Sequence, residues 1–121
     1  WLAATAAVVA LGITGFAGWR YSAGPPDLAG TWDFPNGSYW IVEQTGADLA
    51  IQEVHYDSGE VWKKGQGTID GRSLAFKLDL VFQRGYYTEG ELRLSEDGRR
   101  LTGVAVLHPR NTQADVDLSR R

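Results

Sequence analysis

The sequence contains no cysteine and no methionine, and the lack of cysteine excludes several classes of protein. Without cysteine there is no disulfide framework, no thiol nucleophile and no zinc-cysteine module. Basic residues do not predominate either. The 12 lysines and arginines stand against 15 acidic residues, a formal charge of −3, which argues against nucleic acid as the main partner. The length of 121 residues allows one domain of ordinary size.

Charge is absent from the first 19 residues, which read WLAATAAVVALGITGFAGW and precede Arg20 and Tyr21. A helix of this length spans about 28 Å, close to the ~30 Å hydrocarbon core of a bilayer. The tryptophans at both ends of the run and Tyr21 suit membrane interfaces, where aromatic side chains are enriched. We therefore predict a single transmembrane α-helix over residues 1–21. A secretory signal peptide is the alternative.

Small residues recur at every fourth position of this predicted helix, namely Ala6, Ala10, Thr14 and Gly18. Such a row lets helix backbones approach closely, and close packing is the main source of association between helices in lipid. The row predicts a face that packs against other membrane protein subunits. An alanine-rich anchor without a partner is the alternative.

Turn signals divide the rest of the chain. Residues 22–27 read SAGPPD, which cannot continue a helix and predicts a linker before a domain over residues 28–121. In that domain Asn-Gly, Asp-Gly and similar turn pairs, which favour tight hairpins, arrive at nearly even intervals. They separate eight runs without helical period, which we expect to be strands: 29–34, 38–44, 48–56, 60–69, 73–82, 86–95, 99–108 and 112–119.

The fifth run shows the clearest alternation, because Leu74, Phe76, Leu78, Leu80 and Phe82 share one face. This pattern predicts a strand with one face in the core and the other in water. Successive short hairpins place neighbouring runs side by side, and closure removes the edge strands. We predict an all-β, up-and-down antiparallel eight-stranded barrel. An open sandwich, or a curved sheet completed by another subunit, is the alternative. The mid-strand glycines of Gly65-Gln66-Gly67 predict a kink or bulge.

The first run contains Gly30-Thr31-Trp32. A Gly-x-Trp element that opens an eight-stranded meander resembles the calycin group, which includes lipocalins, fatty-acid-binding proteins and avidins. The resemblance implies that Trp32 plugs one end of the barrel and that an arginine from late in the barrel stacks on it. Arg110 and Arg120 both remain open for that role.

Residues 30–48 are also similar to avidins, whose ligand-contacting serine would fall on Ser38. Two departures stand against biotin as the ligand. Phe34 occupies the position of an asparagine in that family, and no tryptophan follows Trp62 to supply the later aromatic walls.

Candidate chemistry is confined to one local pair, Glu53 and His55, which we expect on one face of the third strand. A metal site would need a third ligand beside His55 and His108, and none is evident. The sequence has no nucleophile elbow and no phosphate-binding glycine loop. We therefore predict no enzyme, no metal and no cofactor.

Aromatic residues supply candidates for a protein interface. Adjacent residues of a strand point to opposite faces, so one member of each pair Tyr39-Trp40 and Tyr86-Tyr87 is available to a partner. The partner-surface candidates are Tyr39, Trp62, Tyr86 and Tyr87. Packing along the outer seam of the barrel is the alternative.

The predicted function is that of a non-catalytic accessory subunit in a larger bacterial membrane protein complex, respiratory or photosynthetic. We expect a single pass through the inner membrane, with the barrel on the periplasmic side and the cytoplasmic side as the alternative. The lipid bilayer and other membrane protein subunits are the expected partners. The competing hypothesis is a membrane-tethered, lipocalin-like protein that holds a small apolar ligand in a lumen lined by Trp40, Glu53 and His55. A lumen filled by side chains favours the first hypothesis, and a pocket favours the second.

Overall fold

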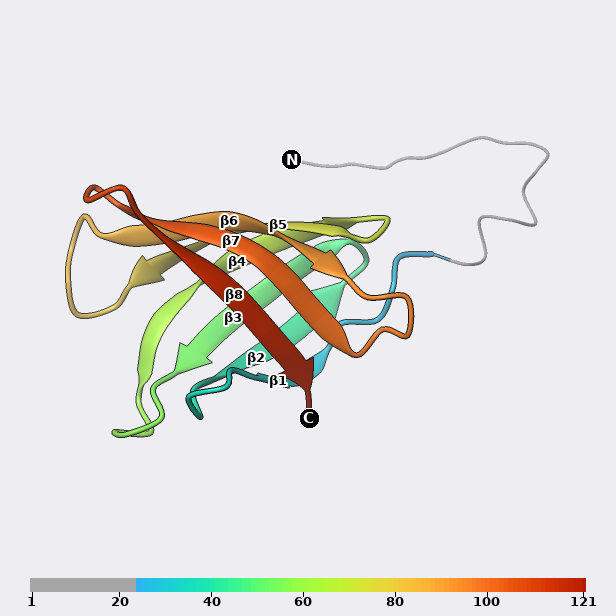
Figure 1. Cartoon of the computed structure of the whole chain (residues 1–121), viewed down its shortest axis with the longest axis horizontal. Coiled ribbons are helices and arrows are strands. Elements are labelled where there is room, and N and C mark those ends of the chain that lie inside the picture. Colours follow the sequence, from blue (N-terminus) through green and yellow to red (C-terminus); the bar gives the residue numbers. More distant parts are fainter. Residues whose placement is uncertain (1–23) are drawn as a thin grey trace.

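The computed structural model describes residues 24–121, which form a closed antiparallel barrel (Figure 1). Its eight strands are β1 (Gly30–Asp33), β2 (Tyr39–Thr45), β3 (Asp48–Val54), β4 (Val61–Asp70), β5 (Ser73–Leu80), β6 (Tyr87–Leu94), β7 (Arg100–His108) and β8 (Thr112–Arg120). Each strand pairs with the next in sequence, and β8 pairs back with β1. The predicted all-β class and up-and-down closure are confirmed, and the architecture is consistent with a calycin-like fold.

The predicted membrane helix over residues 1–21, with its row of Ala6, Ala10, Thr14 and Gly18, lies outside the described residues. So do the first two residues of the predicted linker. Residues 24–121 contain no helix with the length and apolarity that a membrane span requires.

The strands begin and end within two residues of the predicted bounds. One side chain that was predicted for the core is exposed instead. Leu74, Phe76 and Leu78 are buried as expected, whereas Phe82 lies beyond the end of β5 and is 73% exposed. The alternation stops because the backbone leaves the strand at residue 81. There the amide of Val81 donates to the carbonyl of Trp62, and the chain turns toward β6.

The two ends of the barrel are built from different segments. The proximal end, where the described chain begins, carries residues 24–29, the connections 46–47, 71–72 and 95–99, and the C-terminus. The distal end carries the connections 34–38, 55–60, 81–86 and 109–111. In Figure 1 the proximal end lies at the right and the distal end at the left.

Inward-facing side chains fill the lumen. A barrel of eight strands is just wide enough for such side chains or for one small ligand. Leu28 and Trp32 occupy the proximal part, and the rings of Trp40 and Phe76 meet edge-to-face farther along, with centroids 5.1 Å apart. The remaining members of this buried cluster are Val42, Leu49, Ile51, Ile69, Leu74, Leu78, Leu92, Leu94, Leu101, Ala105, Val116 and Leu118.

Glycines let neighbouring strands of the barrel approach closely. Phe76 is paired with Gly67 on one side and with Gly90 on the other. A Cβ atom on Gly90 would lie 2.3 Å from the carbonyl oxygen of Val104, so no side chain fits there. Of the kink or bulge predicted at Gly65–Gly67, the bulge is wrong, because β4 keeps continuous register with β5 along that stretch. The register shift of β4 lies instead opposite Glu53 and Val54 of β3.

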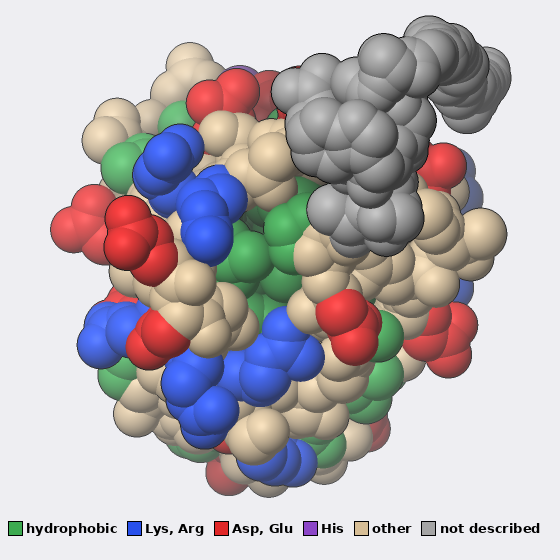
Figure 2. All heavy atoms as spheres, turned by 90° about the vertical axis from the view of Figure 1, so that its right-hand side faces the viewer, with side chains coloured by type: hydrophobic (Ala, Val, Ile, Leu, Met, Phe, Trp, Pro, Cys, Tyr) green, Lys and Arg blue, Asp and Glu red, His purple; other side chains and the backbone are tan. Residues whose placement is uncertain are grey.

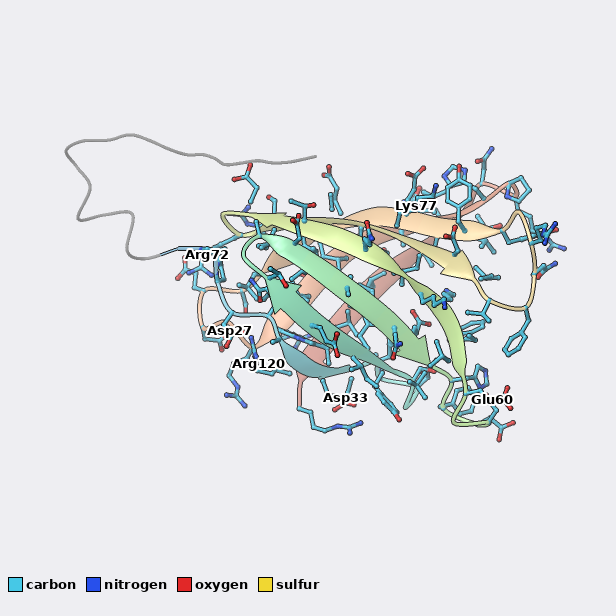
Figure 3. All side chains as sticks on the ribbon, turned by 180° about the vertical axis from the view of Figure 1, so that it is seen from behind. Asp27, Asp33, Glu60, Arg72, Lys77 and Arg120 are labelled. Atoms are coloured by element: carbon cyan, nitrogen blue, oxygen red, sulfur yellow. The ribbon has the colours of Figure 1, made fainter. Side chains whose placement is uncertain are left out.

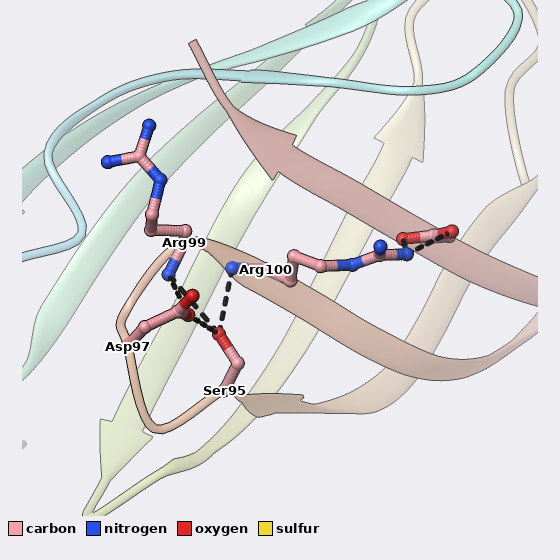
Figure 4. A network of polar contacts seen from close by, with 5 residues as sticks. Ser95, Asp97, Arg99 and Arg100 are labelled. Carbon is pink, nitrogen blue, oxygen red and sulfur yellow. Dashed lines mark hydrogen bonds and ion pairs between the residues drawn. The ribbon is translucent and has the colours of Figure 1, made fainter.

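Polar side chains fix the connection between β6 and β7 (Figure 4). The Ser95 hydroxyl donates to Oδ1 of Asp97 at 2.6 Å, and the amide of Arg99 donates to the same oxygen at 3.1 Å. The hydrogen bond from Ser95, followed by that from the Arg99 amide, holds the pKa of Asp97 below its ordinary value of 3.8. The turn is therefore best ordered when Asp97 is ionised.

Replacing Gly90 tests the close approach of β6 and β7. We expect Gly90→Ala to lower the free energy of unfolding by about 1–3 kcal/mol, because the added methyl group collides with backbone. Thr102→Ala, at an exposed position of β7, is the matched control and should change it by less than about 0.5 kcal/mol. Chemical denaturation of both variants measures the difference, and equal stability would contradict the tight packing.

Candidate functional site

Trp32 closes the proximal end of the barrel. Its side chain is fully buried, and its Nε1 donates to the carbonyl of Leu28 at 2.9 Å. The guanidinium of Arg120 lies 4.5 Å from the centre of the Trp32 ring. Of the two arginines left open by the resemblance, Arg120 thus takes this position, whereas Arg110 lies in the distal connection between β7 and β8.

The same arginine holds the segment that leads into β1. Arg120 donates to the carbonyls of Asp27 and of Ala29, the latter at 3.2 Å. From the other side, Oε1 of Gln44 accepts from the Leu28 amide at 2.6 Å, and its Nε2 donates to the carbonyl of Pro26 at 2.8 Å. Figure 3 shows Asp27 and Arg120 together at the proximal end, with Glu60 at the other. No local pattern in the sequence marks Gln44 for this task.

Glu53 is the buried carboxylate of the distal half. It is 6% exposed, and its Oε1 accepts from Nε1 of Trp40 at 2.9 Å. Its Oε2 lies 3.8 Å from Nζ of Lys63, and that ammonium lies 4.6 Å from the centre of the Trp62 ring. The structure therefore brings together two predicted site residues, Trp40 and Glu53, and adds Lys63, which sequence analysis missed as a site residue.

His55 does not join this group. Strand β3 ends at Val54 after the register shift, so His55 lies in the distal connection. Its Nδ1 accepts from the amide of Asp57 at 3.1 Å, and its ring stacks on Tyr56 with centroids 4.6 Å apart. The expectation that Glu53 and His55 share a strand face is wrong, because β3 ends at Val54 and His55 lies beyond it. Within residues 24–121 no hydrogen bond joins the two side chains.

Ser38 has a backbone partner at the distal end. The side chain is buried, and its hydroxyl accepts from the amide of Tyr56 at 3.1 Å. This bond ties the β1–β2 connection to the β3–β4 connection at the distal end.

The four partner-surface candidates are all half-buried. Arg121 covers Tyr39 at 4.7 Å from the ring centre, and Tyr87 stacks on His108 with centroids 4.7 Å apart. Trp62 meets the ring of His55 edge-to-face at 5.1 Å, and Tyr86 lies in the β5–β6 connection.

A different set of apolar side chains is exposed at the distal end. It consists of Tyr56, at 59% exposure, Val81, at 44%, and Phe82. We call these three residues the distal patch. Period-two alternation could not find it, because alternation assigned Phe82 to the core.

Two of the hollows among the described residues are not lined by Trp40, Glu53 or His55. One, of about 340 Å³, lies on the outer wall across β2 to β5 and is lined by Ile41, Gln52, Lys64 and their neighbours. The other, of about 410 Å³, lies at the proximal end between Pro26, Arg72 and Leu94. Across residues 24–121, no three His, Asp or Glu side chains gather as a metal site would require.

No family model, curated protein or solved structure matches the chain. Three features of the described residues bear on function: a core of buried side chains in the lumen, a proximal end closed by Trp32 and Arg120, and exposed apolar side chains at the distal end.

Arg120→Ala tests the clamp on the segment before β1. We expect it to lower the free energy of unfolding by about 2 kcal/mol, since it removes a cation–π contact and several hydrogen bonds to carbonyls. Faster amide exchange at Leu28 should accompany the loss. Arg110→Ala makes the same change at an exposed distal position and should leave both measurements unaltered. Equal effects of the two substitutions would contradict the clamp.

Proposed function

We propose that the protein is a non-catalytic accessory subunit of a bacterial membrane protein complex. In this proposal residues 1–21 pack in the inner membrane and the barrel, on the periplasmic side, clamps neighbouring subunits. The observation that carries it is the contrast between a lumen filled by side chains and apolar side chains left exposed at the distal end. A barrel with a filled lumen and exposed apolar side chains at one end is better suited to contact with another protein than to capture of a ligand.

Contacts through His55 and Trp62 link Tyr56 to the connection that carries Val81 and Phe82. Tyr56 stacks on His55, and His55 meets Trp62 edge-to-face. The carbonyl of Trp62 accepts from the amide of Val81 at 2.9 Å, which places the β5–β6 connection beside β4. Aromatic side chains are common anchors of protein interfaces, because they bury much area at little cost in side-chain entropy. The patch therefore supports a neighbouring protein at the end of the barrel opposite the predicted anchor.

The membrane part of the proposal rests on the sequence. Residues 1–19 carry no charge, and the small residues recur at the spacing that favours helix packing in lipid. A respiratory or photosynthetic complex is the class of host that fits a small single-pass subunit with an extrinsic domain.

Two variants test the proposal in the native membrane. Ala10→Leu combined with Gly18→Leu should release the protein from its complex in native gels, because leucine keeps the backbones apart. Ala4→Leu with Gly12→Leu makes the same two substitutions away from the row and should leave co-migration intact. Phe82→Asp should also weaken the complex, through the distal patch. It should not unfold the barrel, because Phe82 is not part of the core. Unchanged co-migration of both test variants would contradict the proposal.

A second candidate function has its own observation in favour. The hydroxyl of Thr88 and Nε1 of Trp62 are buried without a hydrogen-bond partner in the described part of the chain. Buried polar atoms usually find partners, and a polar group of a ligand would supply one. Thr88 faces the lumen from β6 and pairs with Leu78 of β5, which in turn pairs with Gly65, two residues from Lys63. The alternative is thus a membrane-tethered, lipocalin-like protein for a small apolar ligand with a polar head.

Titration with the fluorescent probe 1-anilinonaphthalene-8-sulfonate separates the two functions. For an accessory subunit with a filled lumen we expect no saturable rise in probe fluorescence with the native protein. Saturable binding of one probe per chain, reduced by Thr88→Val, would instead favour the ligand-binding function.

A further inference from the structure

We propose that the distal mouth of the barrel binds a small apolar molecule through hydrogen bonds to an uncharged carbonyl group. The distal mouth is the inner space between Lys63 of β4 and Ala114 of β8, strands that lie on opposite walls of the eight-stranded barrel. The proposal rests on the second candidate function above. It adds the place of the ligand, the side chains that meet its polar head and the chemistry of that head.

The buried core stops short of the distal end. Along β5 the inward-facing side chain of Leu78 is buried, but that of Leu80, at the end of the strand, is only half-buried. Leu107, near the distal end of β7, is also half-buried. Along β8 Val116 is buried, whereas Ala114, which shares its face two residues nearer the distal end, is exposed. The lumen therefore opens at the distal mouth, while side chains fill the part behind it.

The proximal end is closed. Leu28 and Trp32 are fully buried there, and hydrogen bonds from Gln44 and Arg120 hold the segment that crosses over them. Figure 2 faces this end and shows hydrophobic side chains at its centre. A ligand of the lumen therefore enters and leaves at the distal end.

Polar side chains gather at the level of the distal mouth. Glu53, Lys63 and Thr88 each lie within three residues of the distal end of their strands. Nζ of Lys63 lies 3.8 Å from Oε2 of Glu53, too far for a hydrogen bond, and 4.6 Å from the centre of the Trp62 ring. In the part of the chain that the structure describes, the Thr88 hydroxyl and Nε1 of Trp62 are buried without a partner.

Hydrogen-bond donors outnumber acceptors in this group. The indole of Trp62, the hydroxyl of Thr88 and the ammonium of Lys63 can all donate. The carboxylate of Glu53 already accepts from Nε1 of Trp40 at 2.9 Å, and its charge balances that of Lys63. A second anion would be buried here without a counter-charge, which is costly. The group that fits is therefore an uncharged carbonyl oxygen, which can accept two hydrogen bonds.

Apolar side chains surround these donors. Thr88 pairs with Leu78 on one side and with Leu107 on the other. On the wall that faces Lys63, Ala114 pairs with Ala105, so that wall carries small side chains. Binding sites for small molecules are mostly apolar with a few polar groups that fix orientation. The distal mouth thus suits the ring of a small aromatic or alicyclic ketone, ester or amide.

A matched pair of compounds tests the chemistry of the head. 2-Acetylnaphthalene carries a ketone oxygen, and 2-ethylnaphthalene has the same carbon skeleton without it. The full-length chain in lipid nanodiscs is equilibrated with each compound by dialysis, and empty nanodiscs measure the uptake by lipid. We expect saturable binding of one molecule of the ketone per chain.

Thr88→Val should weaken binding of the ketone about fivefold, as expected for one lost hydrogen bond, and should leave binding of the hydrocarbon unchanged. Thr102→Val makes the same substitution at an exposed position of β7 and should change neither affinity. Ala114→Trp should abolish binding of both compounds, because it fills the distal mouth without removing a donor. In chemical denaturation Thr88→Val should be as stable as the parent chain, since its hydroxyl has no partner among the described residues.

The other outcomes contradict separate claims. If neither compound binds saturably, both the site and the second candidate function are wrong. Binding that Ala114→Trp abolishes but Thr88→Val does not weaken leaves that function standing and overturns the carbonyl contact. Binding that survives Ala114→Trp lies elsewhere and overturns the distal mouth as the site. A loss of stability in Thr88→Val would show that a water molecule already satisfies the hydroxyl, and it would overturn the assignment to a ligand.

Discussion

The pairing of β8 with β1 is the constraint on which the rest of the structure depends. β1 has four residues, and only two of them, Trp32 and Asp33, are in register with β8. Side chains reinforce this short seam: Arg120 lies over Trp32, and Arg121 pairs with Asp33 at 2.7 Å. Without this closure β1 and β8 would become exposed edges, and the lumen would open to water.

Closure of the sheet also separates the protein into two unlike ends. The segment before β1 must cross the proximal end to reach the seam, and Leu28 and Trp32 are buried beneath that crossing. The distal end has no such cover. Its longer connections leave Tyr56, Val81 and Phe82 exposed, and its buried polar atoms are less completely paired. The proposed contact of the distal end with a neighbouring protein follows from this asymmetry.

Sequence patterns predicted the barrel well because turn chemistry and alternation are local. Pairs such as Asn36-Gly37 and Asp70-Gly71 mark hairpins by their tolerance of positive φ, so seven connections and eight strands could be counted. Side chains near strand ends were harder to place. Phe82 continues the alternating pattern of the sequence but lies past the end of β5, and His55 lies past the end of β3.

Local sequence patterns could not predict contacts between segments that are distant in the sequence. Nothing near Lys63 indicates that it approaches Glu53, and Gln44 gives no sign that it receives the amide of Leu28. Both contacts depend on register across the sheet. The choice between Arg110 and Arg120 was open for the same reason, since only closure determines which arginine reaches Trp32.

The central claim, that this is an accessory subunit held between protein neighbours, is tested most directly by photo-crosslinking in intact cells. A photoreactive amino acid is placed at Phe82 in the distal patch and, in a second strain, at Ala10 in the predicted membrane helix. The account predicts discrete crosslinked products with protein subunits of one complex from both positions. Products with lipid alone at both positions, or no crosslink at Phe82, would contradict it.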